Sequence, residues 1–201
     1  MPLPRAPLPS ASALRARSLA AAALLLAACA TVPPPPATAI PAVSPVADAA
    51  FALDGRLSAR RGADAVAVGF AWVHEPPRDT LVVTSPLGQT LAELEGDTGL
   101  RRARLTLADG RTAEDDDWAA LTGRMLGFPL PVDALAAWVR ASPHAGSAYL
   151  VEADGSGRVS LLRQDGWEIA YGYPDADARR PARLRLGTSD TEVRIVIERW
   201  R

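Results

Sequence analysis

The chain lacks several features that enzymes and membrane-spanning proteins commonly use. Only one of its 201 residues is cysteine and two are histidine, and lysine is absent, so that all 22 basic residues are arginine. A single cysteine excludes an intramolecular disulfide and any C-x-x-C motif, and two histidines far apart in the sequence exclude the H-E-x-x-H motif of zinc hydrolases. No apolar run reaches the roughly 20 residues of a transmembrane helix.

Charge of neither sign is in excess. The formal net charge is −1, so the basic surplus typical of nucleic-acid-binding proteins is missing, and no nucleic acid is expected as a partner. Hydrophobic residues make up 48% of the chain and charged residues 22%, which suits a soluble domain with a substantial core. The length allows one such domain after processing.

Catalytic motifs are absent as well. The sequence has no G-x-S-x-G nucleophile elbow and no glycine-rich phosphate loop. The acidic run at residues 114–117 lacks the alternating ligands, central glycine and distal glutamate of a calcium loop, and the first turn of a helix explains it better. His74 and Glu75 could be acid–base partners, but their loop-like setting favours solvated side chains. We therefore expect neither an enzyme nor a metal or cofactor site.

The first 28 residues have the composition of a secretory signal peptide. Three arginines and no acid precede an apolar run from Leu19 to Ala28. This run has about ten residues, which fits a signal peptide better than the alternative of a membrane-spanning helix.

The run ends in Leu-Ala-Ala-Cys at residues 26–29, which resembles the lipobox of bacterial lipoproteins. The resemblance implies that Cys29 receives lipid and becomes the mature amino terminus; a chance buried thiol is the alternative. Two or more acyl chains would give a stable membrane anchor. Ala30, where many inner-membrane lipoproteins have aspartate, resembles the outer-membrane class.

Residues 29–50 are rich in proline and alanine and carry no charge before Asp48. Consecutive prolines at 33–36 favour an extended polyproline conformation. We interpret residues 29–50 as a lipidated tether that holds a domain of residues 51–201 off the membrane. A chain terminus of no particular length fits this segment equally well.

Alternation of residue types predicts strands through most of that domain. In residues 65–72 one face carries Val66, Val68, Phe70 and Trp72 and the other only alanine and glycine, so both faces are expected to be covered by protein or ligand. The same period indicates strands at 51–57, 80–84, 89–96, 100–107, 158–164, 167–173, 182–187 and 191–200, with hairpin turns at Asp109-Gly110 and Asp154-Gly155.

Helical spacing occurs only in mid-chain, at residues 113–126 and 131–141, each with one apolar stripe. The expected fold is mainly β with inserted α. Two short helices cannot cover a flat sheet of eight or more strands, so we expect an open, strongly curved antiparallel sheet that closes partly around them.

Residues 85–88 predict a four-residue turn with Pro86 in second and Gly88 in fourth place. Leu87 then lies at the tip of the turn and has nowhere to bury locally. From the sequence alone, Leu87 is one exposed leucine of the kind that most proteins have.

Six stretches together carry a family likeness. They are GRLS at 55–58, FAWVHEP at 70–76, LVVTSPLGQT at 81–90, LPVDALAAW at 130–138, GWEIAYGYP at 166–174 and IERW at 197–200. Their order and spacing resemble the LolB family of outer-membrane lipoproteins over roughly residues 51–200. One departure is Ala141, which stands where the family usually has glycine after the helix tryptophan.

The resemblance implies a half-barrel sheet with an apolar cavity between sheet and helices. It implies that the protein receives lipoproteins from the periplasmic carrier LolA by binding their acyl chains, and inserts them into the inner leaflet of the outer membrane, with Leu87 acting in delivery. A different lipid-binding or scaffold lipoprotein is the alternative. A lipid-anchored monomer on the periplasmic face is expected. The expected cavity residues, for which ordinary core packing is the alternative role, are Phe70, Trp72, Trp138, Trp167, Tyr171 and Trp200.

Overall fold

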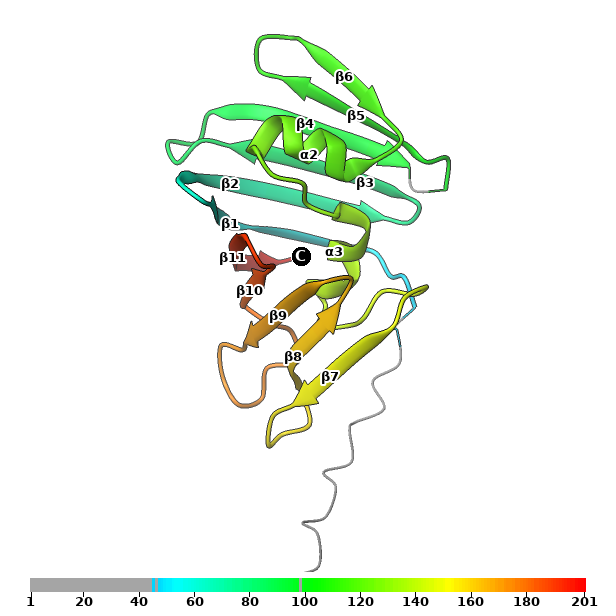
Figure 1. Cartoon of the computed structure of the whole chain (residues 1–201), viewed down its shortest axis with the longest axis vertical. Helices are drawn as coiled ribbons and strands as arrows, with labels where there is room; N and C mark the ends of the chain where they lie inside the picture. Colours follow the sequence, from blue (N-terminus) through cyan, green and yellow to red (C-terminus); the bar gives the residue numbers. More distant parts are fainter. Residues whose placement is uncertain (1–44, 46, 98) are drawn as a thin grey trace, which may run out of the picture. The chain divides into compact units, whose positions relative to one another are not determined.

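A single antiparallel sheet dominates the computed structural model, which describes residues 45, 47–97 and 99–201. The expected signal peptide and Cys29 lie outside the described residues. The eleven strands are β1 (Phe51–Arg61), β2 (Asp64–Glu75), β3 (Arg78–Thr84), β4 (Thr90–Asp97), β5 (Arg102–Leu107), β6 (Thr112–Asp115), β7 (Tyr149–Ala153), β8 (Val159–Gln164), β9 (Trp167–Gly172), β10 (Arg183–Gly187) and β11 (Thr191–Trp200) (Figure 1).

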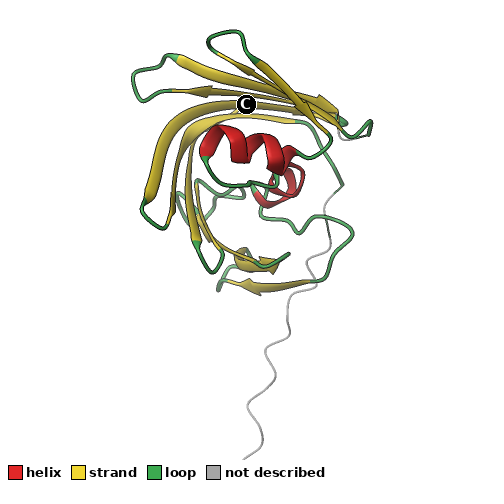
Figure 2. Ribbon diagram, turned by 45° about the horizontal axis from the view of Figure 1, so that its top comes forward, coloured by secondary structure: helices red, strands yellow, loops and turns green. Residues whose placement is uncertain are grey.

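The strand order is β6-β5-β4-β3-β2-β1-β11-β10-β9-β8-β7, so β6 and β7 are free edges and the sheet stays open. The described residues form a strongly curved sheet with two helices in its concavity (Figure 2). This confirms the expected open, mainly β fold with inserted helices. Among the described residues, no helix is long and apolar enough to cross a membrane.

Alternation along the central strands sends bulky side chains to the concave face. Val68 and Trp72 on β2 are buried there beside Leu53 and Leu57 of β1. On the convex face, Ala65 and Ala67 are exposed, so the expectation that both faces of this strand are covered is wrong. A methyl group has little apolar area, and leaving it in water carries only a small penalty.

The first helix begins later than its sequence pattern suggests. Helix α2 runs from Trp118 to Leu126, and Asp117 caps it by accepting a hydrogen bond from the amide of Ala119 at 2.8 Å. The acids before it do not form a first helical turn, because Thr112–Asp115 pairs with β5 as an edge strand. The expected helix over residues 113–126 is thus only partly correct.

Helix α2 packs directly onto the sheet. A Cβ atom added at Gly96 of β4 would lie 2.3 Å from the ring of Trp118, so only glycine permits this close approach.

Helix α3 (Val132–Trp138) lies within its expected range, and all but one of its seven residues are buried. The chain that follows α3 contains Ala141, which stands where the LolB family usually has glycine. Ala141 has φ 55°, in the left-handed region that favours glycine. Its amide donates to the carbonyl of Trp138 at 2.9 Å, and the amide of Ser142 donates to the carbonyl of Ala137 at 3.2 Å. The backbone therefore keeps a glycine-type helix end although the side chain is alanine.

Replacing Ala141 with glycine should therefore stabilise the fold. Removing Cβ from a left-handed residue relieves roughly 1 kcal/mol of strain, less the entropy that glycine adds to the unfolded chain. Urea denaturation should show a higher free energy of unfolding for Ala141→Gly. Ala136→Gly, inside α3, should lower it by about 1 kcal/mol or more. Equal destabilisation by both changes would contradict this account of the helix end.

Candidate functional site

An apolar pocket lies between the concave face and the two helices. Its volume is about 30 Å³, which holds little more than a water molecule. Thr122 is its one polar lining residue, and the hydroxyl of Thr122 is already occupied because it accepts from the amide of Leu130 at 2.8 Å. The lining residues are Leu57, Val68, Phe70, Trp72, Leu81, Val83, Thr122, Met125, Leu126, Leu130, Val132, Leu135, Val139 and Ile195.

The composition of this lining decides what could occupy the space. A lining without free hydrogen-bonding groups favours hydrocarbon over any polar ligand. The present volume is far too small for an acyl chain of many methylene groups. An acyl chain could therefore enter only if α2 and α3 moved away from the sheet.

Two of the six expected cavity residues, Phe70 and Trp72, line this pocket. Trp138 and Trp167 lie together elsewhere, with ring centroids 6.2 Å apart. Trp138 is fully buried, and its indole N–H donates to Gln164 Oε1 at 2.9 Å. A tryptophan fixed in this way holds the end of α3 to β8.

Trp200 and Tyr171 also lie outside the pocket. The indole N–H of Trp200 donates to the carbonyl of Pro181 at 3.1 Å, and its ring meets Phe51 edge-on. Tyr171 lies on β9, and its hydroxyl oxygen is buried. The structure thus brings Phe70 and Trp72 together and places the other four residues around the same concave face.

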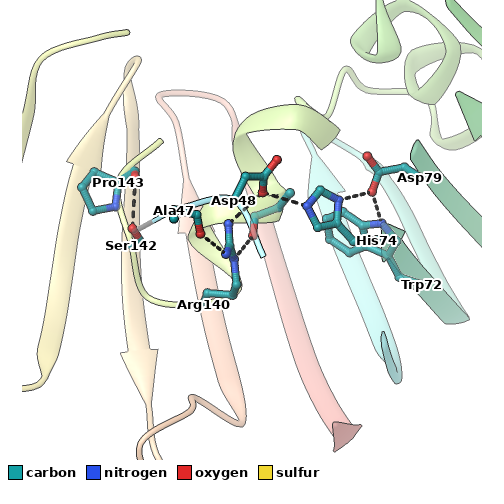
Figure 3. A network of polar contacts seen from close by, with 9 residues as sticks. Ala47, Asp48, Trp72, His74, Asp79, Arg140, Ser142 and Pro143 are labelled. Atoms are coloured by element: carbon teal, nitrogen blue, oxygen red, sulfur yellow. Dashed lines mark hydrogen bonds and ion pairs between the residues drawn. The ribbon is translucent and has the colours of Figure 1, made fainter. Parts of the chain in front are cut away.

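Beside the pocket is a polar network that sequence reasoning missed (Figure 3). His74 is not a solvated loop residue, as its neighbours suggested, but lies on β2 with an exposed fraction of 3%. Its Nδ1 is 2.8 Å from Asp79 Oδ1 and its Nε2 is 2.8 Å from Asp48 Oδ1. The sequence signal that could have revealed this burial is the period of two along the strand. Because Trp72 faces inward, His74 two positions later must lie on the same face.

Both partners of His74 are carboxylates, which only accept hydrogen bonds when ionised. A neutral imidazole has one N–H and could donate to only one of them. With both carboxyl groups ionised, the two contacts together require the protonated ring. Burial lowers the pKa of His74, but the hydrogen bonds to Asp79 and Asp48 outweigh it and raise the pKa above its ordinary value near 6.5.

The network joins three parts of the domain. The guanidinium of Arg140, just beyond α3, donates to Asp48 at 3.1 Å and to the carbonyl of Ala47 at 3.0 Å. Asp79 also accepts from the indole N–H of Trp72 at 2.7 Å, which fixes a pocket-lining ring. The start of the domain, the end of α3 and strands β2 and β3 are thereby held together at the rim of the pocket.

A second histidine has partners that could suggest a hydrolase. His144 Nε2 contacts Asp165, and the hydroxyl of Ser147 is 3.3 Å from the same nitrogen. A nucleophile relay needs the acid and the hydroxyl on opposite nitrogens of the ring. Here the other nitrogen, Nδ1, contacts the carbonyl of Ala145, so this arrangement cannot activate Ser147 in that way.

The turn before β4 holds Leu87 away from the domain. The amide of Gly88 donates to the carbonyl of Ser85 at 2.9 Å, which confirms the four-residue turn, and Gly88 has φ 83°. The hydroxyl of Ser85 accepts from the amides of Leu87 and Gln89. Leu87 itself is 89% exposed, the highest value among the large apolar residues that are exposed.

The raised pKa of His74 predicts that stability falls with increasing pH. Below about pH 6.5 the ring is protonated in both folded and unfolded chains, and the network contributes fully. As pH rises through the folded pKa, the folded ring loses its proton and that contribution disappears. Urea denaturation between about pH 5.5 and pH 8.5 should show this decline, and His74→Gln should flatten it.

Asp48→Asn provides a more conservative check, because it removes one negative charge from beside the ring and should lower the pKa of His74 measured by NMR. A wild-type His74 pKa below 6.5 would contradict the network.

Known proteins resemble the chain over most of its length. Residues 49–200 match the family "Outer membrane lipoprotein LolB". The chain is 37% identical over 161 residues to the outer-membrane lipoprotein LolB of Chromobacterium violaceum, covering 80% of this chain and 85% of that protein. It is 38% identical over 155 residues to that of Azoarcus, covering 76% and 78%.

Among solved structures, a LolA superfamily protein from Nitrosomonas europaea is similar with a TM-score of 0.47 and 10% identity, covering 78% of this chain and 87% of that one. The family match spans most of the domain, and both of these LolB relatives are more than one-third identical to the chain. The chain belongs to the LolB family of outer-membrane lipoproteins.

Proposed function

We propose that the protein receives lipoproteins from a LolA-like periplasmic carrier and inserts them into the inner leaflet of the outer membrane. The observation that carries this proposal is the lining of the space between the helices and the concave face, which is apolar except for Thr122, whose hydroxyl is already hydrogen-bonded. Together with family membership, it favours acyl chains as the ligand. The client lipoproteins, the carrier and the membrane lipid are the partners on this proposal.

Energetics explain how such transfer needs no chemical energy source. Exposing an acyl chain to water is unfavourable by roughly 0.8 kcal/mol for each methylene group. Moving the chain from one apolar cavity to another nearly cancels that penalty. The receptor must bind only somewhat more tightly than the carrier, and the bilayer is the final and most stable location. The transfer is physical, so no covalent bond of the passenger changes.

Movement of the helices would create room for the chain. Helices α2 and α3 meet the sheet largely through apolar side chains, and an acyl chain can replace those contacts with similar ones. The polar network at His74 lies at one edge of this contact, where it would hold the end of α3 while the rest of the helix layer shifts.

The test is a transfer assay with purified components. A carrier loaded with a radiolabelled lipoprotein is mixed with this protein, and the label is followed without added nucleotide. Passage of the label to this protein supports the proposal. A well-folded protein that never acquires label would refute it and favour a scaffold or another lipid-binding role.

Leu87→Glu should separate delivery from receipt. The turn tip is exposed, so the fold should lose less than about 0.5 kcal/mol, and label should still pass from the carrier. Insertion into vesicles should fail, because burying a carboxylate in hydrocarbon is unfavourable by several kcal/mol. Leu87→Val should retain most of the insertion rate.

Leu100 offers a matched control for Leu87, since it is 73% exposed and follows β4, whereas Leu87 precedes that strand. Leu100→Glu should leave both receipt and insertion at wild-type rates. Normal insertion by Leu87→Glu would show that Leu87 is an ordinary exposed leucine.

A lipid anchor at Cys29 would place the protein on the periplasmic face of the outer membrane. Mass spectrometry of the protein extracted from membranes should show a chain that begins at Cys29 and carries added acyl mass. Cys29→Ser should abolish that mass. A chain beginning elsewhere without added acyl mass would rule out this anchor.

A further inference from the structure

The hydroxyl of Tyr171 is a buried donor that has no hydrogen-bond partner among the described residues. Tyr171 alternates with the buried Ile169 on β9 and pairs with the buried Leu184 on β10, so its ring lies on the concave face. Burial raises the pKa of Tyr171 far above its usual range, which keeps the proton on the oxygen. A buried polar group without a partner is unfavourable and uncommon in folded proteins.

The neighbouring tyrosine shows that the fold can satisfy a hydroxyl in this region. Tyr173 donates to the carbonyl of Val159 at 2.9 Å, and the guanidinium of Arg158 lies 4.4 Å from the centre of its ring. Tyr171 and Tyr173, two positions apart in the chain, therefore differ in whether the protein itself accepts the hydrogen bond of the hydroxyl. The protein leaves the donor of Tyr171 unused, and a ligand could reach this buried hydroxyl once the side chains that cover it move.

The position of Tyr171 connects it to the apolar pocket. Across the sheet, Tyr171 pairs with Leu184, Leu184 with Ile195, and Ile195 with Leu57. Ile195 and Leu57 both line the pocket. Tyr171 is therefore two strands away from the pocket wall, on the same face and in the same row, where an acyl chain leaving the pocket along the concavity would reach it.

An acyl chain carries one kind of group that such a donor can recognise. Its methylene groups accept no hydrogen bond, whereas the ester or amide carbonyl at its head accepts one. Apolar contacts alone do not fix how far a chain slides into a cavity, and a few placed polar groups usually do so.

We propose that Tyr171 donates a hydrogen bond to the ester or amide carbonyl at the head of a bound acyl chain, and so sets the depth at which the chain is held. This inference rests on the proposed function, because it assumes that acyl chains occupy the concave face. It gives the site a preference for acylated ligands over alkyl chains of equal length.

Tyr171→Phe in the full chain tests the proposal, since it removes only the hydroxyl. Binding of a fluorescent triacylated lipopeptide, whose three acyl chains are joined through two ester carbonyls and one amide carbonyl, should weaken about five- to tenfold. The free energy of unfolding should stay the same or rise, because a buried donor without a partner is lost. Equal binding by wild type and variant would overturn the proposal.

Tyr173→Phe is the matched control. It removes a hydroxyl that the protein itself satisfies, so it should lower the free energy of unfolding and leave lipopeptide binding unchanged. Weakened binding in both variants to the same extent would point to a general packing effect and would count against a specific role of Tyr171.

Two further probes identify the acceptor. In the first variant of the lipopeptide, ether linkages replace both esters and the amide-linked chain remains. In the second variant, ether linkages again replace both esters and the amine is left free, so the chains carry no carbonyl. The effect of Tyr171→Phe should vanish with the probe whose chains carry no carbonyl, and persistence of the effect with that probe would refute the proposal. If Tyr171→Phe still weakens binding of the amide-bearing probe, the hydrogen-bond acceptor is the amide carbonyl. If Tyr171→Phe no longer weakens binding of that probe, the acceptor is an ester carbonyl. If wild type binds none of the probes, the proposed function fails together with this inference.

Discussion

The pairing of the first strand with the last is the contact on which the rest of the architecture depends. Strand β1 pairs with β2 on one side and with β11 on the other, which joins two half-sheets into one concave face. The free edges then belong to β6 and β7, which are separated in sequence only by the helical segment. That segment must cross from one edge of the curved sheet to the other. Its shortest route runs over the concavity, which is where α2 and α3 lie (Figure 2).

Sequence patterns predict the strands well where one face is buried and the other is not. All nine strand segments expected from alternation occur, because burial of one face fixes a period of two. The two short strands that the pattern misses, β6 and β7, are edges with little buried apolar area, so their pairing with a neighbour decides their conformation. The same pairing removes the acids before Trp118 from the expected helix.

The site is less predictable because it depends on contacts between distant segments. Turn chemistry at Ser85–Gly88 correctly places Leu87 at an exposed tip, since that geometry is local. For the tryptophans, the residue type does not reveal whether the ring meets the pocket: Trp72 does, whereas Trp138 is held by Gln164, 26 residues away. His74 is buried against two carboxyl groups from different segments, which raise its pKa, and no local pattern contains that information.

The contact of Asp48 with His74 also fixes the point at which the proposed tether would join the domain. His74 lies opposite Asp79 at one end of β3, and Leu87 follows the other end of that strand, so the attachment point and the leucine are roughly 20 Å apart along the sheet. The 18 residues between Cys29 and Asp48 span at most about 65 Å when fully extended. That contour length exceeds the separation about threefold. On the proposed function, a chain anchored at Cys29 would therefore be long enough for the domain to turn either end toward the bilayer, outward to meet the proposed carrier and inward to release the proposed passenger.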